Sequence, residues 1–530
     1  MSEPSLFGIG KASDRLGWWS LFFIAEAILA WRGLIRIDLV SNLILVVILF
    51  IPIAAPKVRL ARHALAAIGA IALLYSESWL PSISRVASQA GLVAGFSGAY
   101  LAELAGRFMN VTVIAMLAAG AAAYFVAARF VRVDIFAVAA VVISAVIPMM
   151  KSATESTPPP EASATKATTP AAPVTPEAAL QEFYAKEATR VVQFAAPPAD
   201  APPFDVVFLH ICSLSWDDLE ATGLADHALL KSFDIVLKRY NSVATYSGPA
   251  AIRILRATCG QAPHKALYEP TDEKCYLLAS LSKAGFETQV VLNHDGYFDD
   301  FLKFVKAQNV TATPMAIDDL PVSQRSFDKS RIREDKATLF RWLDGRPKVT
   351  APRTAVYYNS ISLHDGNLTA AGETQKSLET YKPRLKKLLD DVDAFMKKLE
   401  TSGRRAIVVL IPEHGGAVRG DATQIAGLRE IPSPSITRVP VMIRVMGPDA
   451  KRTGEAVSLA EPTSYLAVSH IVSRMLAKPP FGAAGFSPTE YTAGFPITDY
   501  VSENEGTTMI QRGDKFLVRQ ERDAFREYPR

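Results

Sequence analysis

Cysteine is scarce in this chain, and so is charge. Only three of its 530 residues are cysteine, which excludes a small scaffold held together by disulfides. Charged residues make up 21% of the sequence and hydrophobic residues 49%, a balance that excludes a disordered protein. The length predicts roughly three folding units of about 150 residues each.

A basic domain is also missing. Residues 1–150 hold eleven Lys/Arg and seven Asp/Glu, and from totals of 57 and 53 this leaves 46 of each for residues 151–530. The formal net charge of +4 therefore lies in the first 150 residues. Without a basic domain, we do not expect nucleic acid as a partner.

The charge-poor first part contains apolar segments of bilayer length. Leu39–Pro56 and Phe108–Ala128 contain no charge, and each is long enough to cross about 30 Å of hydrocarbon. Three further segments are shorter or carry a charge and are also interpreted as spans: Gly17–Ile35, Ala64–Leu80 and Ile135–Met150. Val86–Ala102 is interpreted as interfacial or re-entrant, with a sixth span as the alternative. The sequence thus predicts an α-helical membrane domain of about five helices over residues 1–150.

The positions of Lys and Arg predict the orientation of these spans. With five spans, the segments on one side hold seven Lys/Arg and those on the other side hold four. The positive-inside rule makes the first side cytoplasmic and places residues 151–530 in the periplasm, outside a bacterial inner membrane. A sixth span would reverse this orientation. Glu26, in the middle of the first span, is expected to face protein or a partner, because a lipid-facing carboxylate is costly.

The cysteines favour the same compartment. All three lie in the soluble part, and Cys259 and Cys275 enclose a short loop of the kind that an oxidising compartment closes with a disulfide. Two free buried thiols are the alternative. Together with the charge distribution, the loop favours a disulfide and a periplasmic domain.

Residues 151–203 are predicted to form a linker. Ten prolines fall in this segment, and Ser, Thr and Ala make up most of the rest. Such a segment is extended and builds no core. A helical apolar pattern over Ala178–Phe194 interrupts it and predicts a short helix that rests on the membrane or on the following domain.

From Phe204 onward, strand patterns alternate with helix patterns. The predicted strands are Asp205–Ile211, Phe233–Leu237, Thr288–Asn293, Thr354–Tyr358, Arg405–Pro412 and Pro440–Val445. The predicted helices are Ala250–Thr258, Leu277–Ala284, Tyr381–Leu399 and Thr463–Leu476. This alternation predicts a layered α/β domain over residues 204–530 with a largely parallel central sheet. In such sheets, functional residues gather at the carboxyl ends of the strands.

Four positions at predicted strand ends offer useful chemistry. Cys212 is either a soft ligand for zinc or a buried inert thiol. Ser247, just before a helix, is either a nucleophile for phosphate or an N-cap. His364 is a ligand, a general acid/base or a structural loop residue. Glu413 and His414 offer a carboxylate and an imidazole together, as zinc prefers, although a plain strand-end turn is the alternative.

These positions complement one another. Four-coordinate zinc with Cys212, Glu413 and His414 as fixed ligands leaves one place for Ser247. Zinc there would lower the pKa of the serine hydroxyl, as it does for bound water. Ser247 would then serve as a nucleophile without a neighbouring base.

Longer runs around these residues resemble a known family. The runs are Ile211-Cys-Ser-Leu-Ser-Trp216, Tyr246-Ser-Gly-Pro-Ala-Ala-Ile-Arg253, Leu363-His-Asp-Gly-Asn367, Pro412-Glu-His-Gly-Gly-Ala417, and Gly427-Leu-Arg429 followed by Ile431-Pro-Ser-Pro-Ser-Ile-Thr437. They resemble the alkaline phosphatase superfamily in its membrane-anchored phosphoethanolamine transferase branch. The resemblance is closer still to bacterial cellulose phosphoethanolamine transferases, encoded with cellulose synthase. It covers residues 204–530 well, and the membrane part in layout.

The resemblance implies a set of site residues and an alkaline-phosphatase-like α/β/α fold. The implied zinc ligands are Cys212, Ser247, Glu413 and His414, with Ser247 as the nucleophile. The implied supporting residues are Tyr246, His364 and Arg429. Cys259 and Cys275 match a disulfide of the family.

The resemblance also implies the reaction. Phosphoethanolamine would pass from phosphatidylethanolamine to the glucose 6-hydroxyl of nascent cellulose through a phosphoethanolamine-serine intermediate. His364 is the candidate to move the acceptor proton, and Arg429 the candidate to stabilise phosphoryl charge. Implied partners besides the two substrates are the inner membrane and subunits of the cellulose synthase complex.

Some features differ from the wider superfamily. Its first ligand is usually acidic where this chain has Cys212, and the lipid A branch uses Thr in place of Ser247. That branch also has a further His after its Asp-His pair, whereas residues 415–450 contain none, which puts a second metal in doubt. The cellulose enzymes share these differences. The alternatives are the same chemistry on lipid A or another glycan, and a non-catalytic scaffold of the cellulose secretion machinery.

Overall fold

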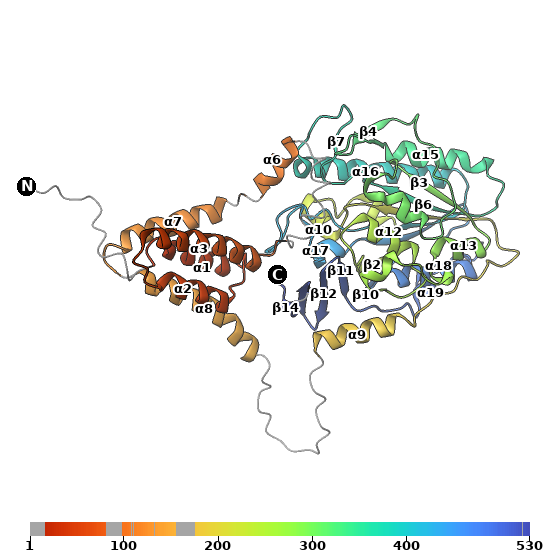
Figure 1. Cartoon of the computed structure of the whole chain (residues 1–530). Helices are drawn as coiled ribbons and strands as arrows, with labels where there is room; N and C mark the ends of the chain where they lie inside the picture. Colours follow the sequence, from red (N-terminus) through yellow and green to blue (C-terminus); the bar gives the residue numbers. More distant parts are fainter. Residues whose placement is uncertain are drawn as a thin grey trace, which may run out of the picture. The chain divides into compact units, whose positions relative to one another are not determined.

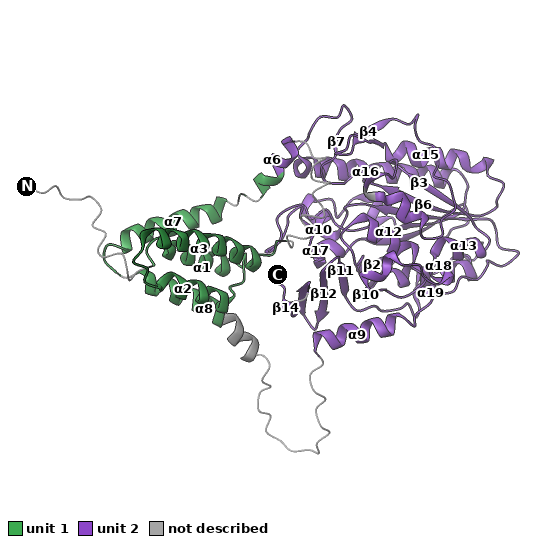
Figure 2. Ribbon diagram, in the orientation of Figure 1, with its two compact units in different colours: residues 1–90, 104–170, 529 green, residues 91–103, 171–528, 530 purple. Residues whose placement is uncertain are grey.

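The structure is a computed structural model of the whole chain (Figure 1). It describes residues 16–80, 98–107, 109, 111–131, 133–154, 175–521 and 523–529. The chain forms two compact units, fewer than its length predicts (Figure 2). One comprises residues 1–90, 104–170 and 529, and the other comprises residues 91–103, 171–528 and 530.

The first unit consists of apolar helices. They are α1 (Trp19–Trp31), α2 (Leu39–Phe50), α3 (Pro56–Glu77), α7 (Val111–Ala127) and α8 (Val133–Thr154). Helix α1 packs on α7 and α8, and α2 packs on α3 and α8. Each of the five segments expected to span a membrane contributes to one of these helices. Glu26 of α1 is fully buried within the unit, as expected for a carboxylate in an apolar helix.

By length and composition, few of the described helices qualify as membrane spans. Among the described residues, α3 is the one helix long and apolar enough to cross a membrane by itself. A second span results if the bent pair α6 (Gly98–Arg107) and α7 counts as one. The proposed re-entrant segment lies outside the described residues up to residue 97, and its last five residues belong to α6. Five spans therefore stay a prediction.

The second unit is built on a seven-stranded sheet in the order β10-β2-β9-β8-β1-β6-β3. Its strands are β1 (Asp205–Ile211), β2 (Ile235–Tyr240), β3 (Glu287–Leu292), β6 (Thr354–Ser360), β8 (Ala406–Leu410), β9 (Val441–Met446) and β10 (Val457–Thr463). The sheet is mixed, because β9 runs antiparallel to both β8 and β2 while the other neighbouring pairs are parallel. All six predicted strands are present, with ends that differ from the predicted ones by at most a few residues. The sequence did not predict the seventh strand of this sheet, β10.

The central strand β1 is buried along its whole length. Even its first residue, Asp205, is fully buried. Its carboxylate accepts hydrogen bonds from Arg346 Nη2 and from the backbone N–H of Thr354, both at 2.9 Å. A buried carboxylate is tolerated only when it is paired in this way, so these bonds hold the start of β1 against β6.

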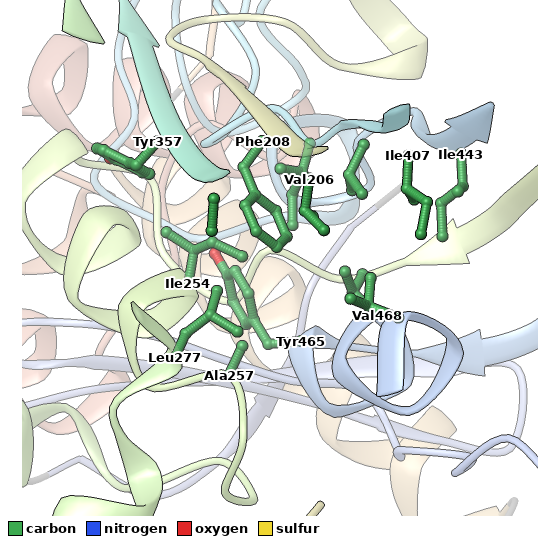
Figure 3. Packing of buried hydrophobic residues seen from close by; sticks show 14 of the residues in the cluster. Val206, Phe208, Ile254, Ala257, Leu277, Tyr357, Ile407, Ile443, Tyr465 and Val468 are labelled. Atoms are coloured by element: carbon green, nitrogen blue, oxygen red, sulfur yellow. The ribbon is translucent and has the colours of Figure 1, made fainter. Parts of the chain in front are cut away.

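Helices cover both faces of the sheet, as predicted for a layered α/β/α domain. One face packs against α12 (Ser247–Leu255), α13 (Leu277–Lys283), α14 (Phe301–Lys306) and α18 (Tyr465–Ala477). The other face packs against α10 (Trp216–Thr222), α11 (Ala228–Lys231), α15 (Asp335–Gly345) and α16 (Ser377–Thr401). Alternate residues of β1 divide between the two cores: Val206 and Phe208 point into the first (Figure 3), and Val207 and Leu209 into the second.

Smaller elements complete the unit. An antiparallel sheet contains β11 (Val501–Asn504), β12 (Thr507–Arg512), β13 (Lys515–Gln520) and β14 (Arg526–Glu527), and a second contains β5 (Arg331–Arg333), β4 (Val322–Arg325) and β7 (Leu368–Thr369). The short helix expected in the proline-rich linker is α9 (Pro176–Glu187). Its Leu180 and Phe183 pack on Val501 and Ile510, so it rests on the C-terminal sheet.

Cys259 and Cys275 form a disulfide, as predicted, and Cys212 is free and buried. Because the chain has three cysteines, thiol titration of unreduced, denatured full-length protein is expected to find one reactive thiol. The disulfide joins two cysteines that are 16 residues apart in the sequence. Because it closes this loop in the unfolded chain, it is expected to contribute about 3 kcal/mol to the free energy of unfolding. Three free thiols in oxidatively produced protein would contradict the disulfide and weaken the proposed periplasmic location.

Candidate active site

The four zinc ligands expected from the sequence meet at the carboxyl edge of the sheet. Cys212 directly follows β1, Ser247 begins α12, and Glu413 and His414 follow β8. The Sγ of Cys212 lies 3.4 Å from Ser247 Oγ and 3.9 Å from His414 Nε2. One ligand atom each of Cys212, Glu413 and His414 lies within 4.8 Å of the others, and all three residues are buried.

Backbone hydrogen bonds beyond the strand ends bring these residues together. The N–H of Glu413 donates to the Ile211 carbonyl at 2.8 Å, and the N–H of Leu214 donates to the His414 carbonyl at 2.6 Å. On the other side, the N–H of Cys212 donates to the Ser360 carbonyl at 2.9 Å. The pairing of β1 with β8 and β6 therefore continues into the loops that carry the ligands.

Ser247 is the first residue of α12, and Tyr246 is its N-cap without a side-chain capping bond. The prediction that this helix begins at Ala250 is wrong, because Gly248 and Pro249 already belong to its first turn. The alternative that Ser247 is an N-cap is also wrong. Its hydroxyl lies beside the thiol and carboxylate instead of capping the helix, and it is partly exposed.

Glu413 and His414 each have one side-chain atom near Cys212 that is available as a metal ligand. Asn359 Nδ2 donates to Glu413 Oε1 at 2.6 Å, whereas the buried Oε2 has no hydrogen-bond partner among the described residues. That Oε2 lies 3.7 Å from His414 Nε2. The other ring nitrogen of His414, Nδ1, donates to the Gly415 carbonyl at 2.9 Å, which leaves Nε2 as an acceptor.

Burial disfavours charge in this cluster. It raises the pKa of the Cys212 thiol to about 12, with a further contribution from Glu413, and raises the pKa of Glu413 itself to about 6. It also lowers the pKa of His414 well below its usual value. A divalent cation would reverse the effect on the two acids, because it favours the thiolate and the carboxylate.

The donor set fits zinc. Zinc takes sulfur, nitrogen and oxygen ligands at about 2.0–2.3 Å in a tetrahedron, which separates neighbouring ligand atoms by about 3.3–3.8 Å. The separations here are 3.4 Å from Cys212 to Ser247, 3.7 Å from Glu413 to His414 and 3.9 Å from Cys212 to His414. The unpartnered Glu413 Oε2 is the kind of buried atom that a metal ion would satisfy.

The three supporting residues surround this cluster. Arg429 Nη1 lies 3.2 Å from both Ser213 Oγ and His414 Nδ1. The Arg429 guanidinium lies 5.9 Å from the ring centroid of Tyr246, whose hydroxyl donates to Glu430. Burial lowers the pKa of His364 to about 4, and the positive charge of Arg429 adds to the shift. Tyr246 and Arg429 therefore lie at the cluster, and His364 lies within electrostatic reach of Arg429.

Amide side chains support the site and were not predicted from the sequence. Asn359 orients Glu413, and its Oδ1 accepts from His294 Nε2 at 2.8 Å. Asn504 Nδ2 donates to the Arg429 carbonyl at 3.1 Å. Asn359 is the next-to-last residue of β6, which pairs with β1, so the rule on strand ends would have found it if amides had been considered. Nothing in the sequence pairs Asn504 with Arg429.

Asp218 supports the loop that follows the ligands. It accepts hydrogen bonds from the backbone N–H of Gly416 at 2.7 Å and from Ser215 Oγ at 2.8 Å. A Cβ on Gly415 would lie 2.6 Å from Ser215 Oγ, so only glycine fits there. The two glycines therefore let the chain turn against Asp218 directly after His414.

The fold and the site together define a class: layered α/β proteins with a candidate metal-binding cluster and a serine hydroxyl beside it at the carboxyl edge of the sheet. Within this class, the chain belongs to the BcsG family of cellulose biosynthesis proteins. The family models for the C-terminal and N-terminal domains of cellulose biosynthesis protein BcsG match residues 160–525 and 19–146. The chain is 38% identical over 541 residues to cellulose biosynthesis protein BcsG of Escherichia coli (strain K12), covering 97% of this chain and 96% of that protein.

Solved structures resemble the chain more distantly. A protein in the alkaline phosphatase superfamily from Vibrio parahaemolyticus has a TM-score of 0.46 at 12% identity, over 65% of this chain and 86% of that chain. The C-terminal periplasmic domain of EcEptC from Escherichia coli, in complex with Zn, has a TM-score of 0.45 at 14% identity, over 64% of this chain and 96% of that chain. With TM-scores below 0.5, neither likeness supports a conclusion about this chain.

Proposed function

We propose that this protein transfers phosphoethanolamine from phosphatidylethanolamine to the glucose 6-hydroxyl of nascent cellulose. The observation that carries the proposal is the Ser247 hydroxyl, which lies 3.4 Å from Cys212 Sγ beside the buried Glu413 and His414. Membership in a family of cellulose biosynthesis proteins supports cellulose as the acceptor.

The first step forms a covalent intermediate. Zinc, held by Cys212, Glu413, His414 and Ser247, would supply the positive charge that lowers the pKa of the serine hydroxyl. Ser247 Oγ attacks the donor phosphorus, and the bond from phosphorus to the diacylglycerol oxygen breaks. The serine proton ends on that oxygen. Phosphoethanolamine remains attached to Ser247, and diacylglycerol leaves.

The second step transfers the group to the glycan. A glucose 6-hydroxyl attacks the phosphorus, and its proton passes to His364. The bond to Ser247 Oγ breaks, and the proton held by His364 then restores the serine hydroxyl. The lowered pKa of His364 keeps its imidazole neutral near pH 7, so the ring has a nitrogen that can accept this proton. The Arg429 guanidinium stabilises the charge that develops on the phosphoryl oxygens.

The pH dependence of transfer follows from the pKa of His364. A histidine with a pKa of about 4 stays neutral as the pH falls, so kcat/KM is expected to decline only below about pH 5. If His364 had the ordinary histidine pKa, kcat/KM would already decline near pH 6.5. The measurement is the rate of transfer to cello-oligosaccharides between pH 4 and 8, with zinc content determined at each pH. An acid limb at pH 6.5 or above with zinc retained would contradict this role for His364.

We further propose a multi-pass anchor in the inner membrane over residues 1–150, a linker over 151–203 and a periplasmic catalytic domain over 204–530. The apolar helices of the first unit and the disulfide of the second support this arrangement. A membrane anchor gives the site access to a lipid donor. It also brings the site close to subunits of the cellulose synthase complex, the proposed partners.

Mass spectrometry of secreted polysaccharide tests the proposal. Cellulose from a strain with the gene should carry phosphoethanolamine on glucose, and cellulose from the deletion strain should carry none. Complementation with the wild-type gene should restore the modification. Unmodified cellulose in both strains, or phosphoethanolamine on lipid A that depends on the gene, would contradict cellulose as the acceptor.

A further inference from the structure

Two phenylalanine rings pack against the candidate catalytic histidine. The Phe298 ring meets the His364 imidazole edge-on, with centroids 5.7 Å apart, and the Phe327 ring lies 6.2 Å from it. The two phenylalanines also contact each other at 4.7 Å in a T-shaped pair. Phe298 precedes α14, and Phe327 lies in the turn between β4 and β5. The two rings therefore come from separate segments of the chain.

These rings are not part of the two hydrophobic cores of the sheet. Neither belongs to the clusters that pack on either face, and both are partly exposed. Tyr297, the residue before Phe298, is 80% exposed. Aromatic side chains gathered at the surface beside a candidate active site indicate a binding surface rather than core packing.

The position of His364 determines which substrate these rings would meet. If His364 accepts the proton of a glucose 6-hydroxyl, that hydroxyl lies within about 3.2 Å of an imidazole nitrogen. The pyranose ring begins one carbon further on, which places it close to the imidazole that the two phenylalanines contact. A pyranose ring carries C–H groups on its faces, and these pack on the electron-rich face of an aromatic ring.

The charges around the His364 imidazole differ from those around the two rings. The positive charges of Arg429 and Arg384 both act on His364, and Asp365 offsets them in part. Arg384 Nη1 donates to the His364 carbonyl at 3.0 Å, which places its guanidinium at this loop. At the imidazole, the two guanidinium groups would repel an ammonium group. Beside the rings, the exposed Asp295, Asp300 and Asp328 would attract one, so the choice of a sugar ring rests on the position of His364 and not on charge.

We propose that Phe298 and Phe327 form an aromatic subsite that binds a glucosyl ring of the acceptor, a β-linked glucan chain. The inference rests on the proposed function and deepens it. The subsite would hold the sugar whose 6-hydroxyl faces His364, so it would act on acceptor binding in the second step.

The test uses full-length protein in detergent, with phosphatidylethanolamine as the donor and cellopentaose as the acceptor. Phe298→Ala and Phe327→Ala are each expected to raise the KM for cellopentaose about tenfold, in line with about 1.4 kcal/mol for one aromatic contact. The increase should not extend to the KM for the donor. Phe298→Trp should restore acceptor binding, and Phe298→Leu, which keeps an apolar side chain without the aromatic face, should not.

Phe340→Ala is the matched control. Phe340 is also a partly buried phenylalanine, but it lies on α15 beneath the Lys398 ammonium group, 4.3 Å from its ring centroid. This variant should keep the wild-type KM values. If Phe298→Ala and Phe327→Ala leave the KM for cellopentaose unchanged, or raise only the KM for the donor, the subsite is overturned. Transfer to cellopentaose by the wild-type protein would still uphold the proposed function in that case. A wild-type protein that does not modify cellopentaose would overturn both.

Discussion

Ser247→Ala is expected to lower phosphoethanolamine transfer by at least about 10⁴-fold, the usual scale for loss of a catalytic nucleophile. Without its hydroxyl, no covalent intermediate forms. The fold should persist, because the side chain makes no capping bond and is partly exposed. The measurement is transfer to cello-oligosaccharides by purified full-length protein, with circular dichroism to verify the fold.

Two further variants sharpen this test. Ser458→Ala removes an exposed hydroxyl from the edge strand β10 and should leave transfer unchanged. Ser247→Thr keeps a hydroxyl at the same position and should retain part of the activity. Modified glycan at near wild-type level in Ser247→Ala would disprove the nucleophile assignment.

Cys212→Ala is expected to lose metal and activity together. The thiol is fully buried, and burial raises its pKa to about 12, so a thiolate forms there only with a cation beside it. Metal ligation would also protect Cys212 from alkylation until zinc is chelated. Cys212→Asp is expected to keep some metal and some activity, because a carboxylate is also a zinc ligand.

The competing interpretation makes Cys212 a buried hydrophobic residue. The structure gives this view a basis, since Cys212 packs with Ile332 and Ile361. It predicts that Cys212→Ala loses some stability but keeps its full zinc content. Metal analysis of the folded variant distinguishes the two, and one zinc per molecule, held as tightly as in wild type, would mean that the proposed ligand set is wrong.

The central strands could be predicted from the sequence because they are buried on both faces. Asp205–Ile211 reads as an almost continuous apolar run, and β1 has these bounds. Strand β10 was missed because it lies at the sheet edge, where exposed Ser458 and Glu461 and the residue Pro462 break the apolar pattern. The start of α12 was placed too late because Gly248 and Pro249 were taken to precede the helix. In the structure both belong to its first turn, where proline is favoured.

The reactive residues of the candidate site could be predicted from local sequence, whereas their supports could not. Cys212, Glu413 and His414 each follow an apolar strand, so the topology of a parallel sheet brings them together. The contact of Asn504 with the Arg429 carbonyl depends on folding between residues 75 positions apart. The pairing of Phe298 with Phe327 likewise depends on two loops that only the tertiary structure places side by side.

The most direct test of the account is the mass of the peptide that contains Ser247. Wild-type protein incubated with phosphatidylethanolamine alone should gain one phosphoethanolamine group on this serine. Addition of cellopentaose should remove the group from the protein and place it on the oligosaccharide. Modified cellopentaose formed while Ser247 stays unmodified throughout the reaction, including in rapidly quenched samples, would contradict the covalent mechanism proposed here.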